Sequence, residues 1–188
     1  MVDRKDTQSA QTWVATLPPM SLMTEDLDGF IATYPIPYSP RPVLSITSEN
    51  EIILARTDNF LFYRIDPNGG ETLATTLPVE PIRLTLEDKK DFSGFSARIH
   101  QLARDHMPET RPAIISRVIP DADNGFWAGY QEIERNINRW VYIDPSGTIL
   151  YEVDLPASFM PHQYKDSIIY GLESDEFGEN TIKAFHIE

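Results

Sequence analysis

The stretch YRIDPNGGETLATTLP, residues 63–78, returns in altered form as VYIDPSGTILYEVDLP, residues 141–156. Each copy has an aromatic residue, then Ile-Asp-Pro, a turn that ends in Gly, a short apolar run and Leu-Pro. Asp, Pro, Asn and Gly are the residues that tight turns prefer, and the flanking runs have the length of strands. The two copies therefore predict one β-hairpin that the chain uses twice.

Short β-type runs surround both hairpins and fall into groups. Turn residues separate the runs, which is typical of sandwiches, barrels and propellers. The first group is expected over 42–78, at 42–48, 51–56, 59–66 and 71–78. The second is expected over 113–156, at 113–119, 126–133, 139–144 and 148–156, and the third at 167–174 and 180–188. The pattern predicts an all-β fold.

A helical insertion separates the first two groups and sets the length of the repeat. Ile65 and Ile143 lie 78 positions apart. Removing an insertion of roughly 30 residues leaves about 45, the length of a four-stranded propeller blade. Thr85 and Asp88 form a capping-box-like pair before a helix expected near 86–107, within an insertion over 85–108. Its apolar residues at helical spacing are Phe92, Phe95, Ile99 and Leu102, and Pro108 ends it.

The two ends of the chain supply an incomplete repeat. Residues 12–18 match the fourth strand of a blade, and residues 184–188 match a third strand. With residues 1–11 as a disordered lead-in, residues 12–188 form one half-propeller domain of about three four-stranded antiparallel blades. Three blades do not close a ring, because propellers have four to eight. Either a second copy completes a six-bladed ring or the chain is part of a longer protein.

The chain from about Pro40 to Glu188 resembles the C-terminal half of bacterial six-bladed β-propeller proteins of uncharacterised function. The matching features are SPRPV (39–43), the Asp-Pro-x-Gly turns, RPAIISRVIPDADNGFWAGY (111–130) after the insertion, and the hairpin LESDEFGEN (172–180). The resemblance implies no catalytic motif. It implies an exported or periplasmic location, although no signal peptide is apparent in this chain.

The negative net charge of the chain limits the kinds of partner that it is expected to bind. The chain has 16 Lys and Arg against 29 Asp and Glu, a net charge of −13. Nucleic acids and anionic membranes are bound through cationic surfaces, so neither is expected as a partner. The chain has no cysteine, which excludes disulfides and thiolate metal sites.

Several acidic residues and histidines resemble parts of functional sites, but a structural role is expected for each. Asp121 to Glu132 partly matches a calcium loop, but its glycine is misplaced and Phe126–Tyr130 reads as strand, so a polar turn is expected. His100 and His106 are expected on the surface of the helix. Solvated hairpin carboxylates are expected at Glu173, Asp175, Glu176 and Glu179. Trp13, Trp127 and Trp140 are expected to pack blade against blade. We assign no catalytic residue, metal ligand or cofactor.

The polar residues expected to face a central channel are Arg41, Arg117 and His162, which lie in or near innermost strands. They are the candidate ligand-binding residues. The predicted function is a non-catalytic propeller module that binds a small molecule or a protein, with a homodimer closing the ring. The alternative is a metal-dependent, lactonase-like hydrolase that uses the mouth of the channel.

Overall fold

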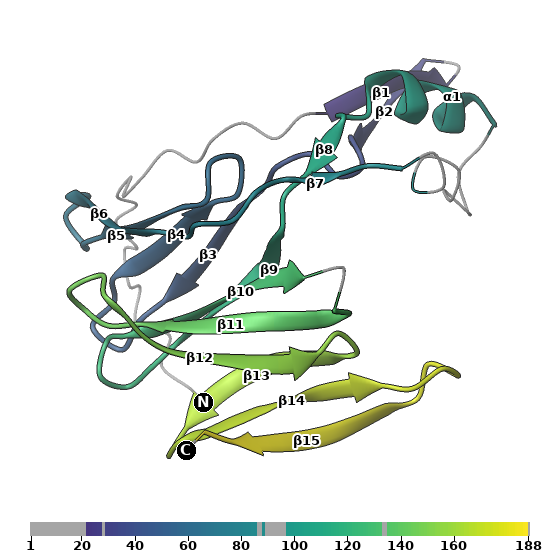
Figure 1. Ribbon diagram of the computed structural model, residues 1–188. Helices are drawn as coiled ribbons and strands as arrows, with labels where there is room; N and C mark the ends of the chain where they lie inside the picture. The colour runs from purple at the N-terminus through teal and green to yellow at the C-terminus, as the bar shows by residue number, and fades with distance from the viewer. Residues whose placement is uncertain (1–21, 28, 86–87, 89–96, 133–134, 188) are drawn as a thin grey trace, which may run out of the picture.

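A computed structural model describes residues 22–27, 29–85, 88, 97–132 and 135–187 (Figure 1). Two four-stranded sheets and one three-stranded sheet make up most of it. The first sheet contains β3 (Pro42–Ile46), β4 (Ile52–Arg56), β5 (Leu61–Ile65) and β6 (Glu71–Thr76). The second contains β9 (Ile114–Pro120), β10 (Phe126–Glu132), β11 (Ile137–Ile143) and β12 (Ile149–Pro156). The third contains β13 (Phe159–Lys165), β14 (Ile168–Ser174) and β15 (Asn180–His186).

Each of the three sheets is an antiparallel meander, with its strands paired in chain order. Figure 1 shows the sheets stacked one above the other with a twist between them. The first strands of consecutive sheets lie side by side, β3 next to β9 and β9 next to β13. The predicted all-β class is confirmed, and the sheets have the form of propeller blades. They are called blades one, two and three below.

One five-residue turn recurs between the strands. Its first residue donates its N–H to the carbonyl of the fifth, and its fourth residue has a positive φ. At Asp66, Asp144 and Asp175 the side-chain Oδ1 accepts the N–H groups of the third and fifth residues. The fourth residues are Asn50, Gly69, Asn124, Gly147 and Gly178. The repeated Asp-Pro-x-Gly phrase is therefore a turn that carries its own hydrogen-bond acceptor.

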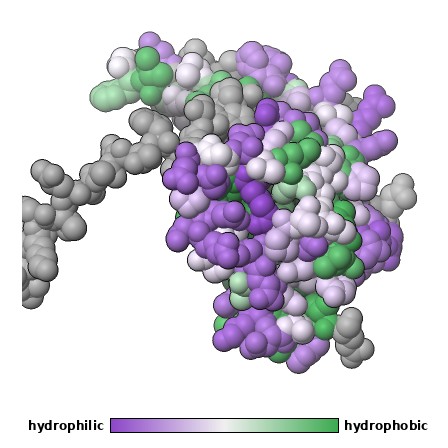
Figure 2. All heavy atoms as spheres, turned by 90° about the vertical axis from the view of Figure 1, so that its left-hand side faces the viewer, coloured by the Kyte–Doolittle hydropathy of each residue, from purple (hydrophilic) through white to green (hydrophobic). Residues whose placement is uncertain are grey.

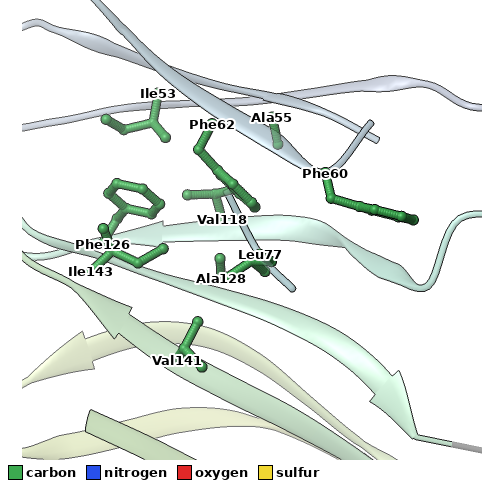
Figure 3. Packing of buried hydrophobic residues seen from close by; sticks show 10 residues of the cluster. All are labelled: Ile53, Ala55, Phe60, Phe62, Leu77, Val118, Phe126, Ala128, Val141 and Ile143. Carbon is green, nitrogen blue, oxygen red and sulfur yellow. The ribbon is translucent and has the colours of Figure 1, made fainter. Parts of the chain in front are cut away.

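A hydrophobic cluster joins blade one to blade two (Figure 3). Alternate residues of each strand face the same side of a sheet, so Ile53, Ala55 and Phe62 all point toward blade two. Phe126 meets them from β10, with its ring centroid 5.7 Å from that of Phe62. The remaining buried members are Phe60, Leu77, Val118, Ala128, Val141 and Ile143.

A second cluster joins blade two to blade three. Trp127 and Trp140 are fully buried there, together with Phe159 and Ile169. Tyr164 of β13 packs on Trp127 with a centroid distance of 5.4 Å. The predicted packing role of these two tryptophans is confirmed, whereas Trp13 lies outside the described residues.

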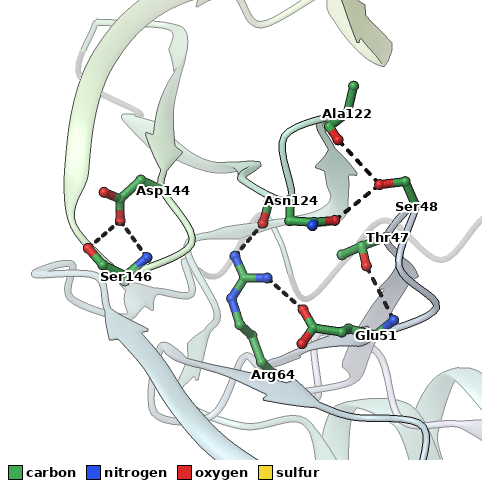
Figure 4. Close-up of polar contacts among 8 residues, drawn as sticks. All are labelled: Thr47, Ser48, Glu51, Arg64, Ala122, Asn124, Asp144 and Ser146. Atoms are coloured by element: carbon green, nitrogen blue, oxygen red, sulfur yellow. Dashed lines mark hydrogen bonds and ion pairs between the residues drawn. The ribbon is translucent and has the colours of Figure 1, made fainter.

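A polar clasp also joins blades one and two, at the end of the sheets where the recurring turns lie (Figure 4). Arg64 of β5 donates to Glu51 at 3.0 Å and to the carbonyl of Asn124 at 2.5 Å. Its guanidinium also lies 5.6 Å from the ring centroid of Phe126. The hydroxyl of Ser48 donates to the side chain of Asn124 at 3.1 Å.

One helix and two two-stranded sheets lie together at the upper right of Figure 1, and of these only the helix falls within the predicted insertion 85–108. They are α1 (Ala97–His106), β1 (Leu22–Leu27) paired with β2 (Phe30–Pro35), and β7 (Ile82–Arg83) paired with β8 (Thr110–Arg111). The predicted reciprocal pair is present, because Thr85 N–H donates to Asp88 Oδ2 at 2.8 Å and Asp88 N–H to Thr85 Oγ1 at 3.2 Å. Residues 86, 87 and 89–96 of the predicted helix lie outside the described residues. The helix that is described is not long and apolar enough to cross a membrane.

Other expectations differ from the structure or fall outside it. Blade three begins with β13, which the predicted range 167–188 omits. The predicted strand at 12–18 and the lead-in at 1–11 are outside the described residues. Asp121 begins a polar turn that leads directly into β10, as predicted in preference to a calcium loop.

Candidate functional site

Arg117 of β9 and His162 of β13 meet on the two adjacent inner strands. Arg117 Nη1 lies 2.5 Å from His162 Nδ1 and 3.5 Å from the carbonyl of Pro161. A guanidinium only donates hydrogen bonds, so Nδ1 of His162 is the acceptor and carries no proton. Both residues lie at irregularities in strand pairing. The register of β9 against β10 shifts between Ala128 and Tyr130, and the register of β13 against β14 shifts between Pro161 and Gln163. Such bulges redirect side chains relative to a regular strand.

The protonation of His162 reflects these surroundings. Desolvation lowers the pKa of His162, and the nearby charge of Arg117 lowers that pKa further. Both effects favour the neutral imidazole, which is the form that accepts the hydrogen bond from Arg117. Arg117 and His162 thus hold each other in one arrangement while the imidazole is neutral.

Arg41 lies apart from this pair, beside a pocket of about 410 Å³ between blades one and two. The pocket opens where β3 and β9 begin. Its lining residues are Tyr38, Ser39, Arg41, Val43, Thr57, Arg111, Pro112, Ala113, Gln131, Asn138 and Ala157. A volume of this size is within the range of small-molecule sites.

Two arginines line the pocket, Arg41 from just before β3 and Arg111 from β8, and hydrogen bonds hold the backbone of the first and the side chain of the second. The amide of Arg41 donates to Thr57 Oγ1 at 2.9 Å, and the Thr57 hydroxyl donates back to the Arg41 carbonyl at 2.8 Å. Thr57 is buried, so this exchange anchors the backbone of Arg41. Arg111 donates through Nη2 to the side-chain oxygen of Gln131 at 2.8 Å.

A smaller hollow of about 270 Å³ lies between blades two and three and shares Asn138 and Ala157 with the first pocket. Its walls are more apolar, with Trp140, Phe159 and Leu172 among them. The two hollows therefore adjoin along blade two.

The left-hand side of Figure 1 is a mainly hydrophilic face. Figure 2 shows hydrophilic residues over most of this face, with hydrophobic residues in separate patches. Within the part of the chain that the structure describes, no three or more His, Asp or Glu side chains gather in a way that could hold a metal ion.

The sequence prediction named Arg41, Arg117 and His162 together, and the structure brings only Arg117 and His162 into contact. Arg111 and Gln131 were missed as pocket residues. A sequence signal for Arg111 exists, because Arg41-Pro42 and Arg111-Pro112 each stand just before the inner strand of a blade. Aligning the two blades from these dipeptides pairs Arg41 with Arg111.

Known proteins give little further guidance. The sequence matches no described protein family and no curated protein. Among solved structures, one similar chain is a streptogramin B lyase, 19% identical over 86% of this chain and 46% of the lyase, with a TM-score of 0.40. Another is a catalytically inactive virginiamycin B lyase from Staphylococcus aureus with quinupristin, 20% identical over 88% of this chain and 63% of the lyase, with a TM-score of 0.31.

The chain thus spans about half the length of the first lyase and less than two thirds of the second. Both TM-scores are below 0.5, so neither likeness bears on the function of this chain.

Proposed function

We propose that this chain is a non-catalytic interaction module, equivalent to half of a six-bladed propeller, and that a second copy completes the ring. Its resemblance to bacterial six-bladed propellers of uncharacterised function supports the ring size and favours an exported or periplasmic location. The observation that carries the proposal is that both end blades present exposed apolar side chains on the faces where the described residues supply no neighbouring blade.

The outer face of blade one is apolar along all four of its strands. Residues that alternate with the buried Ile53, Ala55 and Phe62 point away from blade two. On this outer face Leu44 is 50% exposed and Ile46 is 60% exposed. The other apolar residues of the face are Ile52, Leu61, Tyr63 and Leu73, while Leu54 and Ile65 on the same side of the sheet are already buried. A sheet of this composition gains free energy when another apolar layer covers it.

The outer face of blade three has the same character. Phe159, Ile169 and Phe185 face blade two, so the residues between them face outward. Met160, Tyr170 and Ile182 are exposed there, the last of them 78%. Each end of the three-blade stack therefore has an apolar sheet face.

A second copy would cover both outer faces at once. The outer face of blade three in one copy would pack on the outer face of blade one in the other, in the way that blade one packs on blade two within the chain. A two-fold axis generates this junction twice and closes the ring, since each copy supplies both kinds of face. Repeat units of this type need neighbours on both sides to bury their apolar surfaces.

The test is to place a charge on the proposed junction. Leu44→Asp should convert dimers to monomers in sedimentation velocity, because a carboxylate buried between blades has no partner. Leu150→Asp is the matched control, because Leu150 is also 50% exposed but lies on β12 of the middle blade. Circular dichroism establishes that both variants remain folded.

Ile182→Asp tests the other side of the same junction and should dissociate the dimer as Leu44→Asp does. Equal association of Leu44→Asp, Ile182→Asp and Leu150→Asp would overturn the ring proposal.

A further inference from the structure

We infer that the pocket between blades one and two binds a small organic anion, and that Arg41 and Arg111 hold its carboxylate or phosphate group. The pocket lies within one chain, between its first two blades. The inference therefore does not depend on closure of the ring and goes beyond the proposed function.

The first support is that two arginines line one pocket. Arg41 lies just before β3 and Arg111 lies in β8, shortly before β9, and each is followed by proline. The two hydrogen bonds with Thr57 hold the backbone of Arg41 in place. Nη2 of Arg111 donates to the side chain of Gln131, an uncharged partner that also lines the pocket.

The second support is the charge of the lining. The chain carries a net charge of −13, but none of the described residues that line this pocket is Asp or Glu. Hydrogen bonds from Thr85 are the main cause of the lowered pKa of Asp88, and the charge of Arg111 lowers that pKa further. Asp88 is not part of the lining, and the hydroxyl and amide of Thr85 already bind its carboxylate. Among the described residues, the pocket therefore combines two cations with no acidic side chain in an otherwise acidic protein.

The third support concerns the kind of anion. Arginine pairs well with carboxylate and phosphate because its planar N–H groups match their oxygens in twos. Apolar walls from Val43, Pro112 and Ala113 suit a carbon skeleton, and the amides of Gln131 and Asn138 can contact polar substituents. A pocket of about 410 Å³ accommodates a compact molecule, not a polymer.

The experiment uses isothermal titration calorimetry with two probes, succinate and inorganic phosphate, at low ionic strength. Arg41→Ala and Arg111→Ala should each weaken binding of the better probe by about tenfold or more, because each removes a charge-assisted contact. Arg104→Ala is the control, since Arg104 is exposed on α1 and bonds to Gln101 outside the pocket. Stronger binding of succinate would identify a carboxylate, and stronger binding of phosphate a phosphate ester.

Arg41→Gln removes the same charge while keeping most of the side chain, so it serves if an alanine variant fails to fold. Failure of both probes to bind the parent protein overturns the inference. It is equally overturned if Arg41→Gln and Arg111→Ala bind the probes as tightly as Arg104→Ala does. Neither result would alter the mass of the dimer, so this inference and the ring proposal can fail separately.

Discussion

In the recurring turn, aspartate accepts hydrogen bonds and glycine supplies a positive φ. Asp144 Oδ1 accepts the N–H groups of Ser146 and Thr148, and the Ser146 hydroxyl also donates to it. These bonds lower the pKa of Asp144, the hydroxyl of Ser146 being the largest cause. Gly147, with φ of +86°, supplies a backbone conformation that other residues adopt with strain. Gly147 also touches the neighbouring blade, where a Cβ would collide with the carbonyl of Ala74.

This contact predicts different costs for two glycine substitutions. Gly147→Ala and Gly178→Ala share the cost of a positive φ, since Gly178 has φ of +81°. Only the first creates a clash, because nothing lies within 4 Å of the Cβ position at Gly178. Chemical denaturation should show Gly147→Ala to be less stable than Gly178→Ala by about 1–3 kcal/mol. Equal stabilities would mean that blade one does not abut this turn.

His162 predicts how stability changes with pH. Its pKa is lowered in the folded protein, so the unfolded chain, with a histidine pKa near 6.5, binds the proton more readily. The contribution of His162 is therefore complete above the unfolded pKa and is lost as the pH falls through the folded pKa. Urea denaturation between about pH 8 and pH 5 should show this loss, and His162→Gln should reduce it.

The matched control for His162 is Gln163→Ala, a change at an exposed residue of the same strand that does not titrate. It should leave the slope of stability against pH as in the parent protein. If His162→Gln also leaves that slope unchanged, the contact with Arg117 is not what orders the imidazole.

At the scale of elements, strands that form an apolar run between turn residues were predicted closely, and strands without such a run were missed. The strands of blades one and two follow runs rich in β-branched, aromatic and other apolar residues, as in β4 and β5. β13 was not predicted as a strand, since Pro161 and a bulge interrupt its pattern. β7 and β8 have two residues each, too few for any period.

The candidate site was predicted only in part for a similar reason. An innermost strand can be inferred from the repeat, which places Arg117 and His162 near the axis. Their contact depends on two bulges, at which the register departs from simple alternation. The pocket at Arg41 arises between two blades, and local sequence patterns do not reveal such a space.

Substitution of Arg64 tests whether the polar clasp joins blades one and two. The side chain of Arg64 is 11% exposed, and Arg64→Ala removes the donors to Glu51 and to the Asn124 carbonyl. We expect a loss of about 2 kcal/mol in the free energy of unfolding, because partly buried acceptors are left unpaired. Arg56→Ala is the control, since its ion pair with Asp58 is long and exposed and should contribute less than about 1 kcal/mol. Thermal or urea unfolding that ranks the two variants equally would show that the clasp does not join the blades.

At the scale of the whole molecule, the two end blades differ from the middle blade in how their apolar faces are covered. Blade two has an apolar cluster on each of its faces, one shared with blade one and one with blade three. Blades one and three each share one such cluster with another blade in the part of the chain that the structure describes. The same alternation that builds the inner clusters leaves Leu44 and Ile182 exposed on the outer faces.

Sedimentation equilibrium of the parent protein tests this account most directly, because it measures mass without reference to shape. The chain has a mass of 21.5 kDa, and the closed ring predicts a single species of twice that mass at micromolar concentrations. A folded species that stays at 21.5 kDa over the whole concentration range would contradict closure of the ring by a second copy.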